Sequence, residues 1–190
     1  MTQLHALVLS LGHTVTPGLL IPWLIGVNVV WIVILAAYGP HFQQVAGFQL
    51  LDLQNAFRAP QRITFTEALR QVSLYSPEAR ALYWPFFILD NIMPQLAFSS
   101  FAVLWAHLLK GVPTNAAQWF LHSPLLLLPL GVGFFDWFEN LGYILAMHTA
   151  SPRTRHAAMF AALTAKWIKA ACLLPTFILT VPIVMLAVWY

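Results

Sequence analysis

The sequence has few charged residues, and this scarcity restricts the class of protein. Only 8% of its 190 residues are charged, whereas 60% are hydrophobic; a typical soluble domain has about 25% charged residues. A single cysteine, Cys172, excludes an internal disulfide framework and a CxxC redox or zinc motif. The chain also lacks a glycine-rich phosphate loop, an internal repeat and a low-complexity tract. This composition predicts an integral membrane protein with one domain, residues 1–190.

Charge is also missing from the first 16 residues, which contain no Lys, Arg, Asp or Glu. A secretory signal peptide needs a basic n-region, so we expect none here. Residues 4–11 are apolar and form either a short interfacial helix or the outer part of the first span. The net charge of +3 is small and dispersed, which gives no indication of nucleic-acid binding.

Long apolar runs are what the sequence does have. A helix needs about 20 residues to cross a hydrocarbon core of about 30 Å, and four segments meet this length: 18–38, 84–109, 124–147 and 157–189. Gly39-Pro40 is predicted to end the first helix. Residues 114–122 are predicted to be a loop. The fold class is therefore all-α, a four-helix transmembrane bundle.

The connection between the first two spans, residues 39–80, is the one sizeable polar segment. Its residues 66–72 have the pattern of an amphipathic helix, with Thr64 or Thr66 as the N-cap. Ser76-Pro77-Glu78 is a strong start signal for the next helix, which should run to Leu109.

The basic residues of the loops lie almost entirely on one side of this topology. Lys110 is the one basic residue on the opposite side. By the positive-inside rule, the connection 39–80 is cytoplasmic and both termini face away from the cytoplasm. The arginines on the cytoplasmic side are Arg58, Arg62, Arg70, Arg80, Arg153 and Arg155.

Ionisable residues inside the predicted spans are the strongest functional signal. Four polar residues of the third span follow the spacing i, i+3, i+4, i+7, which places them on one stripe of a helix. By helix rise, Glu139 lies about 13 Å and Asp136 about 18 Å from the cytoplasmic end of that span, while Asp90 and Lys166 lie about 9 and 13 Å deep in theirs. The predicted polar layer comprises Asp90, Asn91, Asp136, Glu139, Asn140, Tyr143, Lys166 and Lys169.

A lone charge at this depth costs on the order of 3 kcal/mol, so the layer should contain ion pairs. We expect Lys166 to pair with Glu139 or Asp136, and Asp90 to pair with the remaining cation, Lys169, unless Lys169 extends outward to the interface. Three interpretations are open: a structural clamp, a pocket for a ligand, lipid headgroup or ion, and a catalytic site. None of these residues is assigned a catalytic or metal-binding role.

The histidines give a weaker signal. No two of them have the i, i+4 spacing of a zinc or di-iron site. His13, His107 and His122 would share the outer side, where a haem or copper site stays an open alternative. The sequence identifies no cofactor.

Two runs, one later motif and one lysine carry a resemblance. LYSPEARALY at 74–83 leads into LDNIMP at 89–94, followed by Asp-x-x-Glu-Asn at 136–140 and a lysine, Lys166, in the last span. Over roughly residues 48–172 this resembles an uncharacterised group of small bacterial four-span membrane proteins, with Ser-Pro in place of the glycines usual at the helix start. The layout is also similar to that of the sigma-2 receptor and emopamil-binding group, in topology alone. The resemblance implies the bacterial inner membrane and the site positions, but no activity.

We therefore predict a small polytopic protein of the bacterial inner (cytoplasmic) membrane. The favoured function is non-enzymatic, as a binding or accessory subunit of a membrane complex, with membrane lipids and other membrane subunits as partners and no nucleic acid. The alternative is a ligand-handling protein, either a transporter component or a lipid-modifying enzyme, which uses the polar layer as its pocket.

Overall fold

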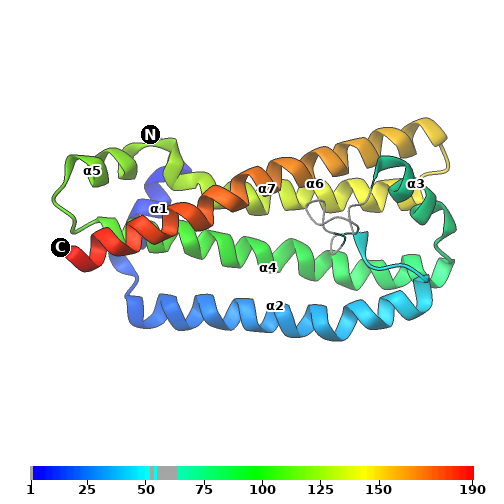
Figure 1. Cartoon of the computed structure of the whole chain (residues 1–190), viewed down its shortest axis with the longest axis horizontal. Coiled ribbons are helices and arrows are strands. Elements are labelled where there is room, and N and C mark those ends of the chain that lie inside the picture. Colours follow the sequence, from blue (N-terminus) through cyan, green and yellow to red (C-terminus); the bar gives the residue numbers. More distant parts are fainter. Residues whose placement is uncertain (1, 52–53, 55–63) are drawn as a thin grey trace. The chain divides into compact units, whose positions relative to one another are not determined.

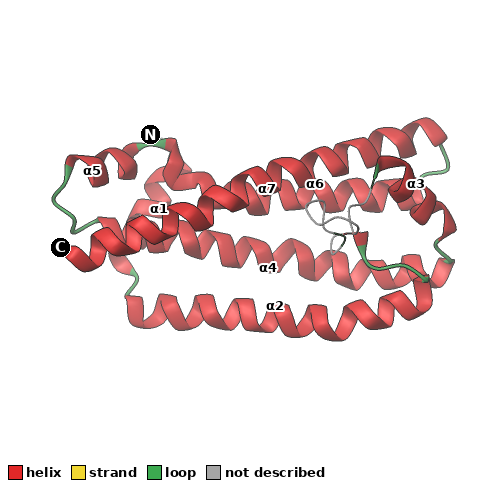
Figure 2. Ribbon diagram, viewed as in Figure 1, coloured by secondary structure: helices red, strands yellow, loops and turns green. Residues whose placement is uncertain are grey.

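The computed structural model describes residues 2–51, 54 and 64–190, and in these residues all regular structure is helical (Figure 2). Arg58 and Arg62 of the predicted connection, with the rest of 55–63 and with 52–53, lie outside the described residues. Figure 1 shows the elements in chain order. They are α1 (Gln3–Thr14), α2 (Pro17–Ala46), α3 (Phe65–Leu74), α4 (Pro77–Leu109), α5 (Asn115–His122), the short 3-10 helix η2 (Pro124–Leu127), α6 (Leu128–His148) and α7 (Pro152–Trp189).

Three of these helices are long and apolar enough to cross a membrane: α2 over Gly18–Ala46, α4 and α7. A fourth span is added if α5 and the segment Pro124–His148, which are bent by 60° at their junction, are counted together. The structure therefore agrees with a multi-pass membrane protein of three or four spans. The four-helix bundle itself stays a prediction.

Several helix boundaries follow the sequence signals. α4 runs from Pro77 to Leu109 as predicted, and the Ser76 hydroxyl caps it by accepting a hydrogen bond from the Ala79 backbone N–H at 3.1 Å. Thr64 is the N-cap of α3 and accepts from the Glu67 N–H at 3.2 Å. These side chains satisfy backbone donors that a helix start leaves without partners.

The predicted end of the first helix at Gly39-Pro40 is wrong, because α2 continues to Ala46. A proline inside a helix removes one backbone hydrogen bond, but the residues that follow it here gain tertiary contacts. Phe42 is fully buried, and its ring packs edge-on against Tyr75 and Tyr83 at centroid distances of 5.6 Å. This packing stabilises the extra helical turns, and the helix propensities of the residues do not include it.

The predicted loop at 114–122 is also wrong, because Asn115–His122 is helix α5. Thr114 caps it by accepting from the Ala117 N–H at 3.2 Å, and Ala117 and Leu121 are buried. His5 of α1 contacts the Leu121 carbonyl oxygen at 2.7 Å through its Nε2. α1 is a helix separate from α2, so it is not the outer part of the first span.

The chain divides into two compact units, each built from several segments. The first unit comprises Met1–Val29, Met93–Phe134 and Lys169–Tyr190; its main core includes Trp105, whose indole N–H donates to the Thr180 hydroxyl at 2.9 Å. The second unit comprises Val30–Ile92 and Phe135–Ile168, and its core is rich in aromatic rings. That the whole chain is one domain stays a prediction.

Candidate functional site

The polar stripe predicted on the third span lies on the buried face of α6. Asp136 is 3% exposed, and Glu139, Asn140 and Tyr143 are fully buried. The intervening large side chains, Trp137, Phe138 and Leu141, are exposed. This arrangement reverses that of a helix at the surface of a soluble protein and is the one expected of a helix whose outer face meets lipid.

An ion pair links α6 to α7 in the second unit. Lys166 Nζ lies 3.0 Å from Glu139 Oε1, and both side chains are buried. The same ammonium donates to the Leu51 backbone oxygen at 2.9 Å and lies 5.9 Å from the centre of the Tyr143 ring. Tyr143 in turn donates its hydroxyl proton to Glu139 Oε1 at 3.2 Å. The pair is thus direct, and its neighbours Leu51 and Tyr143 hold it from two different chain segments.

A second group joins α6 to α4 through an amide. Asn140 Nδ2 donates to Asp90 Oδ2 at 2.8 Å and to Asp136 Oδ2 at 3.3 Å, so one amide contacts two carboxylates. Both aspartates are at least 96% buried, with exposed fractions of 4% and 3%. Asn140 Oδ1 is buried and accepts no hydrogen bond from the described residues. Because buried polar groups in a low-dielectric region need partners, this amide fixes the relative position of the two helices.

The other two predicted members lie at the edge of the layer or outside its unit. The Asn91 amide donates to the Phe87 carbonyl of its own helix, while the Asn91 backbone oxygen accepts from the Trp137 indole N–H at 2.7 Å. Lys169 is half-buried and belongs to the first unit. Its predicted pairing with Asp90 therefore stays a prediction. The seven predicted residues other than Lys169, Asn91 included, all lie in the second unit.

Sequence reasoning missed two participants. Leu51 contributes through its backbone carbonyl, which carries no side-chain signal, although the apolar pair Leu50-Leu51 in an otherwise polar connection indicates burial; both residues are fully buried. Trp137 lies on the exposed face of α6, as an interfacial anchor would, yet its indole N–H donates to the Asn91 backbone oxygen of α4. Tryptophan commonly combines these two roles because one edge of its ring is polar.

The ion pair outside the spans is of a different kind. Arg70 Nη2 lies 2.7 Å from Glu67 Oε1 on α3, and both side chains are exposed. The hydrogen bonds from Arg70 lower the pKa of Glu67 below its ordinary value. Exposed pairs of this kind contribute little to stability because water screens them.

Two of the three histidines predicted to share the outer side direct their rings at backbone carbonyls. His107 Nδ1 lies 3.0 Å from the Gly12 oxygen and His122 Nδ1 lies 2.7 Å from the Gln118 oxygen. Over the part of the chain that the structure describes, no group of three His, Cys, Asp or Glu side chains has the geometry to hold a metal ion.

Comparisons of the chain with protein-family models, curated proteins and solved structures found no match. The class of protein therefore rests on the fold and the site alone. They define an all-helical chain with three or four helices apolar enough to span a membrane and a buried, directly paired polar layer.

Proposed function

We propose that this chain is a multi-pass protein of the bacterial cytoplasmic membrane that acts without catalysis, as a binding or accessory subunit of a membrane complex. Its polar layer is a structural clamp that fixes the packing of α4, α6 and α7. The observation that carries this proposal is the direct pairing of Lys166 with Glu139 at 3.0 Å, with 9% and 0% of the two side chains exposed.

The pairing supports a clamp because it leaves the charges in contact with each other. Removing one partner of a buried ion pair leaves an uncompensated charge, which destabilises a protein by about 3–5 kcal/mol. A pair with this property favours one rotation and one register of α6 against α7. The close approach of the two helices restricts this rotation and register further: a Cβ atom at Gly142 would lie 2.8 Å from the Ala158 backbone oxygen and 2.7 Å from Ala162 Cβ.

The outer faces support a role based on contact with neighbours in the membrane. In the most apolar 18 residues of α2 and of α7, only 11% of the residues are buried, compared with 44% in α4. Large exposed apolar patches mark contacts with lipid or protein. We assign these faces to membrane lipids and to other membrane subunits.

The orientation follows from the loop charges and is part of the proposal. The side with the connection 39–80 faces the cytoplasm, and both termini lie on the other side. Single cysteines can be placed at Ser151 and at Gly111, which are both exposed, in a Cys172→Ser background. We expect a membrane-impermeant maleimide to label Gly111→Cys in intact spheroplasts, and Ser151→Cys only after lysis. The reverse pattern would invert the topology.

The accessory role is tested by capture of partners from native membranes. The tagged chain and its neutral variant Glu139→Gln/Lys166→Met are solubilised in a mild detergent and isolated under identical conditions. We expect the same membrane subunits to accompany both forms, because the clamp needs compatible partners inside the chain rather than charge as such. If the neutral variant folds like the parent but loses the activity associated with the complex, the layer is a functional pocket.

The buried Asn140 oxygen supports the alternative, a ligand-handling protein. Asn140 Oδ1 accepts no hydrogen bond from the described residues, although Asn140 Nδ2 contacts two carboxylates. A transporter component or a lipid-modifying enzyme would place a donor group of its ligand, such as a hydroxyl, on this oxygen. Under this alternative, Asn140→Asp, which keeps an oxygen acceptor, retains part of the transport or lipid modification, while Asn140→Leu abolishes it in a folded chain.

A further inference from the structure

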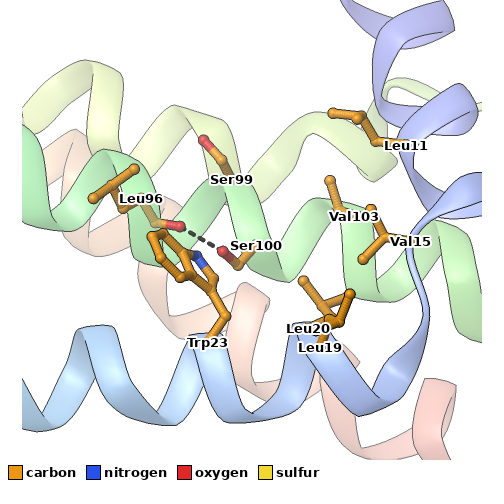
Figure 3. A pocket seen from close by; sticks show the side chains of 9 residues that line it. All are labelled: Leu11, Val15, Leu19, Leu20, Trp23, Leu96, Ser99, Ser100 and Val103. Carbon is orange, nitrogen blue, oxygen red and sulfur yellow. Dashed lines mark hydrogen bonds between the residues drawn. The ribbon is translucent and has the colours of Figure 1, made fainter.

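The first unit contains a hollow that the polar layer does not explain. Its volume is about 420 Å³, and α1, α2 and α4 line it together with the residue that follows α1 (Figure 3). An apolar cavity of about 150 Å³ already binds benzene and stays dry, so this one accommodates a considerably larger apolar group. The lining residues are Leu11, Val15, Leu19, Leu20, Trp23, Leu96, Ser99, Ser100 and Val103.

The polar groups of this pocket are few. The Ser100 hydroxyl donates to the Leu96 backbone oxygen at 2.6 Å, the bond drawn in Figure 3, and is thereby occupied. The Ser99 hydroxyl and the Trp23 indole N–H form no hydrogen bond with the described residues, and no charged residue lines the pocket. The chemistry of the wall therefore fits a hydrocarbon chain with at most one or two hydrogen-bonding oxygens.

A cation of the same unit contacts the chain between two of the lining residues. Lys110 Nζ lies 3.5 Å from the backbone oxygens of Gly12 and of His13, and these two residues stand between the lining residues Leu11 and Val15. The same ammonium lies 3.1 Å from His107 Nδ1. Lys110 is exposed and forms no ion pair with the described residues. The stretch of chain from Leu11 to Val15 thus both lines the apolar pocket and contacts a cation that can bind an anionic group.

We propose that this pocket holds one acyl chain of an anionic membrane phospholipid, with the lipid phosphate at Lys110. The inference rests on the proposed location in a membrane, where such lipids surround α2 and α4. The exposed side chains of Leu19 and Trp23 border the pocket, which leaves the second acyl chain in the surrounding bilayer. Phosphate next to a lysine is a common recognition pair in proteins.

Native mass spectrometry of the full chain in a non-ionic detergent, titrated with dioleoyl phosphatidylglycerol, tests this proposal. We expect one lipid to bind tightly per chain. Ser99→Phe fills the pocket and should weaken binding at least tenfold, while Val29→Phe, at an exposed position of α2 outside the pocket, should not. Lys110→Gln should weaken binding about fivefold, while Arg153→Gln, at another exposed cation, should leave it unchanged.

Two further ligands distinguish the contribution of the acyl chains to binding from that of the phosphate. Dioleoylglycerol has the chains without the phosphate, so its weaker binding should respond to Ser99→Phe and not to Lys110→Gln. Oleate should bind more weakly than phosphatidylglycerol. Equal binding of oleate, or retention of phosphatidylglycerol by Ser99→Phe, would overturn the proposal.

A second measurement keeps the test valid if Ser99→Phe does not fold. A phosphatidylglycerol with a photoreactive acyl chain should label the parent chain chiefly within residues 11–23 and 96–103. Labelling spread evenly over the exposed faces of α2 and α7 would overturn the proposal. Alkaline carbonate extraction measures membrane integration separately, so a chain that stays in the membrane without binding the lipid refutes this inference and leaves the proposed function standing.

Discussion

Replacing Lys166 by Met should destabilise the protein strongly, because Glu139 would keep its charge in a buried position. The Lys166 ammonium contacts Glu139 Oε1 at 3.0 Å and donates to the Leu51 oxygen at 2.9 Å. Removing one partner of a buried ion pair costs about 3–5 kcal/mol. The loss of the hydrogen bond to a buried carbonyl, here the Leu51 oxygen, accounts for about 1–3 kcal/mol of this cost. We therefore expect Lys166→Met to lower the free energy of unfolding by about 3–5 kcal/mol.

The double variant should recover most of this loss. In Glu139→Gln/Lys166→Met both charges are absent, and the remaining deficit is mainly the hydrogen bond to Leu51. We expect the double variant to lie within about 1–2 kcal/mol of the parent, since buried ion pairs replaced by neutral groups of similar size are often neutral in stability. The coupling energy of the cycle should then be at least about 2 kcal/mol, more than a tenfold effect on the unfolding equilibrium.

The assay is titration of the protein with sodium dodecyl sulfate in dodecyl maltoside micelles, with loss of helix followed by far-ultraviolet circular dichroism. The exposed pair of Glu67 and Arg70 serves as the matched control, because its cycle Glu67→Gln/Arg70→Met should show little coupling. If the single and double variants of the Lys166–Glu139 pair add without coupling, or if the double variant is as unstable as Lys166→Met, the structural clamp is refuted.

Three further predictions concern the packing and the polar groups. Gly142→Ala should destabilise the protein by about 1–3 kcal/mol because the new methyl group would meet backbone. Gly26→Ala, whose methyl group meets nothing within 4 Å, should be neutral or stabilising in the same titration. Equal effects of the two substitutions would contradict the close helix contact. Asn140→Leu should cost about 2–4 kcal/mol by removing the donor shared by two buried carboxylates, whereas Asn28→Leu, at an exposed amide that bonds its own helix, should change little. The lowered pKa of Glu67 means that its charge supports α3 above the ordinary carboxyl pKa and that this support is lost as the pH falls through the lowered value. Hydrogen exchange should therefore show α3 losing protection at acid pH in the parent, while Glu67→Gln shows no such dependence over that range.

The buried stripe of α6 was predictable because helical spacing alone brings its members to one face, and the cost of polar groups in the membrane directs that face inward. The contact between Lys166 and Glu139 was one of two expected pairings, since both residues lie at similar depth. The choice between Glu139 and Asp136 depends on the rotation of α7 about its axis, which depth does not determine.

Other parts of the structure depend on contacts between distant segments and have no local signal. The Leu51 carbonyl reaches Lys166 because the chain after α2 turns back into the core of the second unit. The extension of α2 to Ala46 depends on the burial of Phe42, which outweighs the breaking tendency of Gly39-Pro40. The pocket in the first unit is likewise a product of packing, as its lining comes from residues about 80 positions apart.

The most direct test of the structural clamp is an experimental structure of the chain, isolated with its native neighbours and held in a lipid nanodisc, at a resolution that shows bound molecules. We expect direct contacts from Lys166 to Glu139 and from Asn140 to Asp90 and Asp136, with no foreign density between them and with another polypeptide against an exposed helix face. Density for a headgroup, an ion or a cofactor inserted between Glu139 and Lys166 would contradict the clamp and identify the layer as a ligand site.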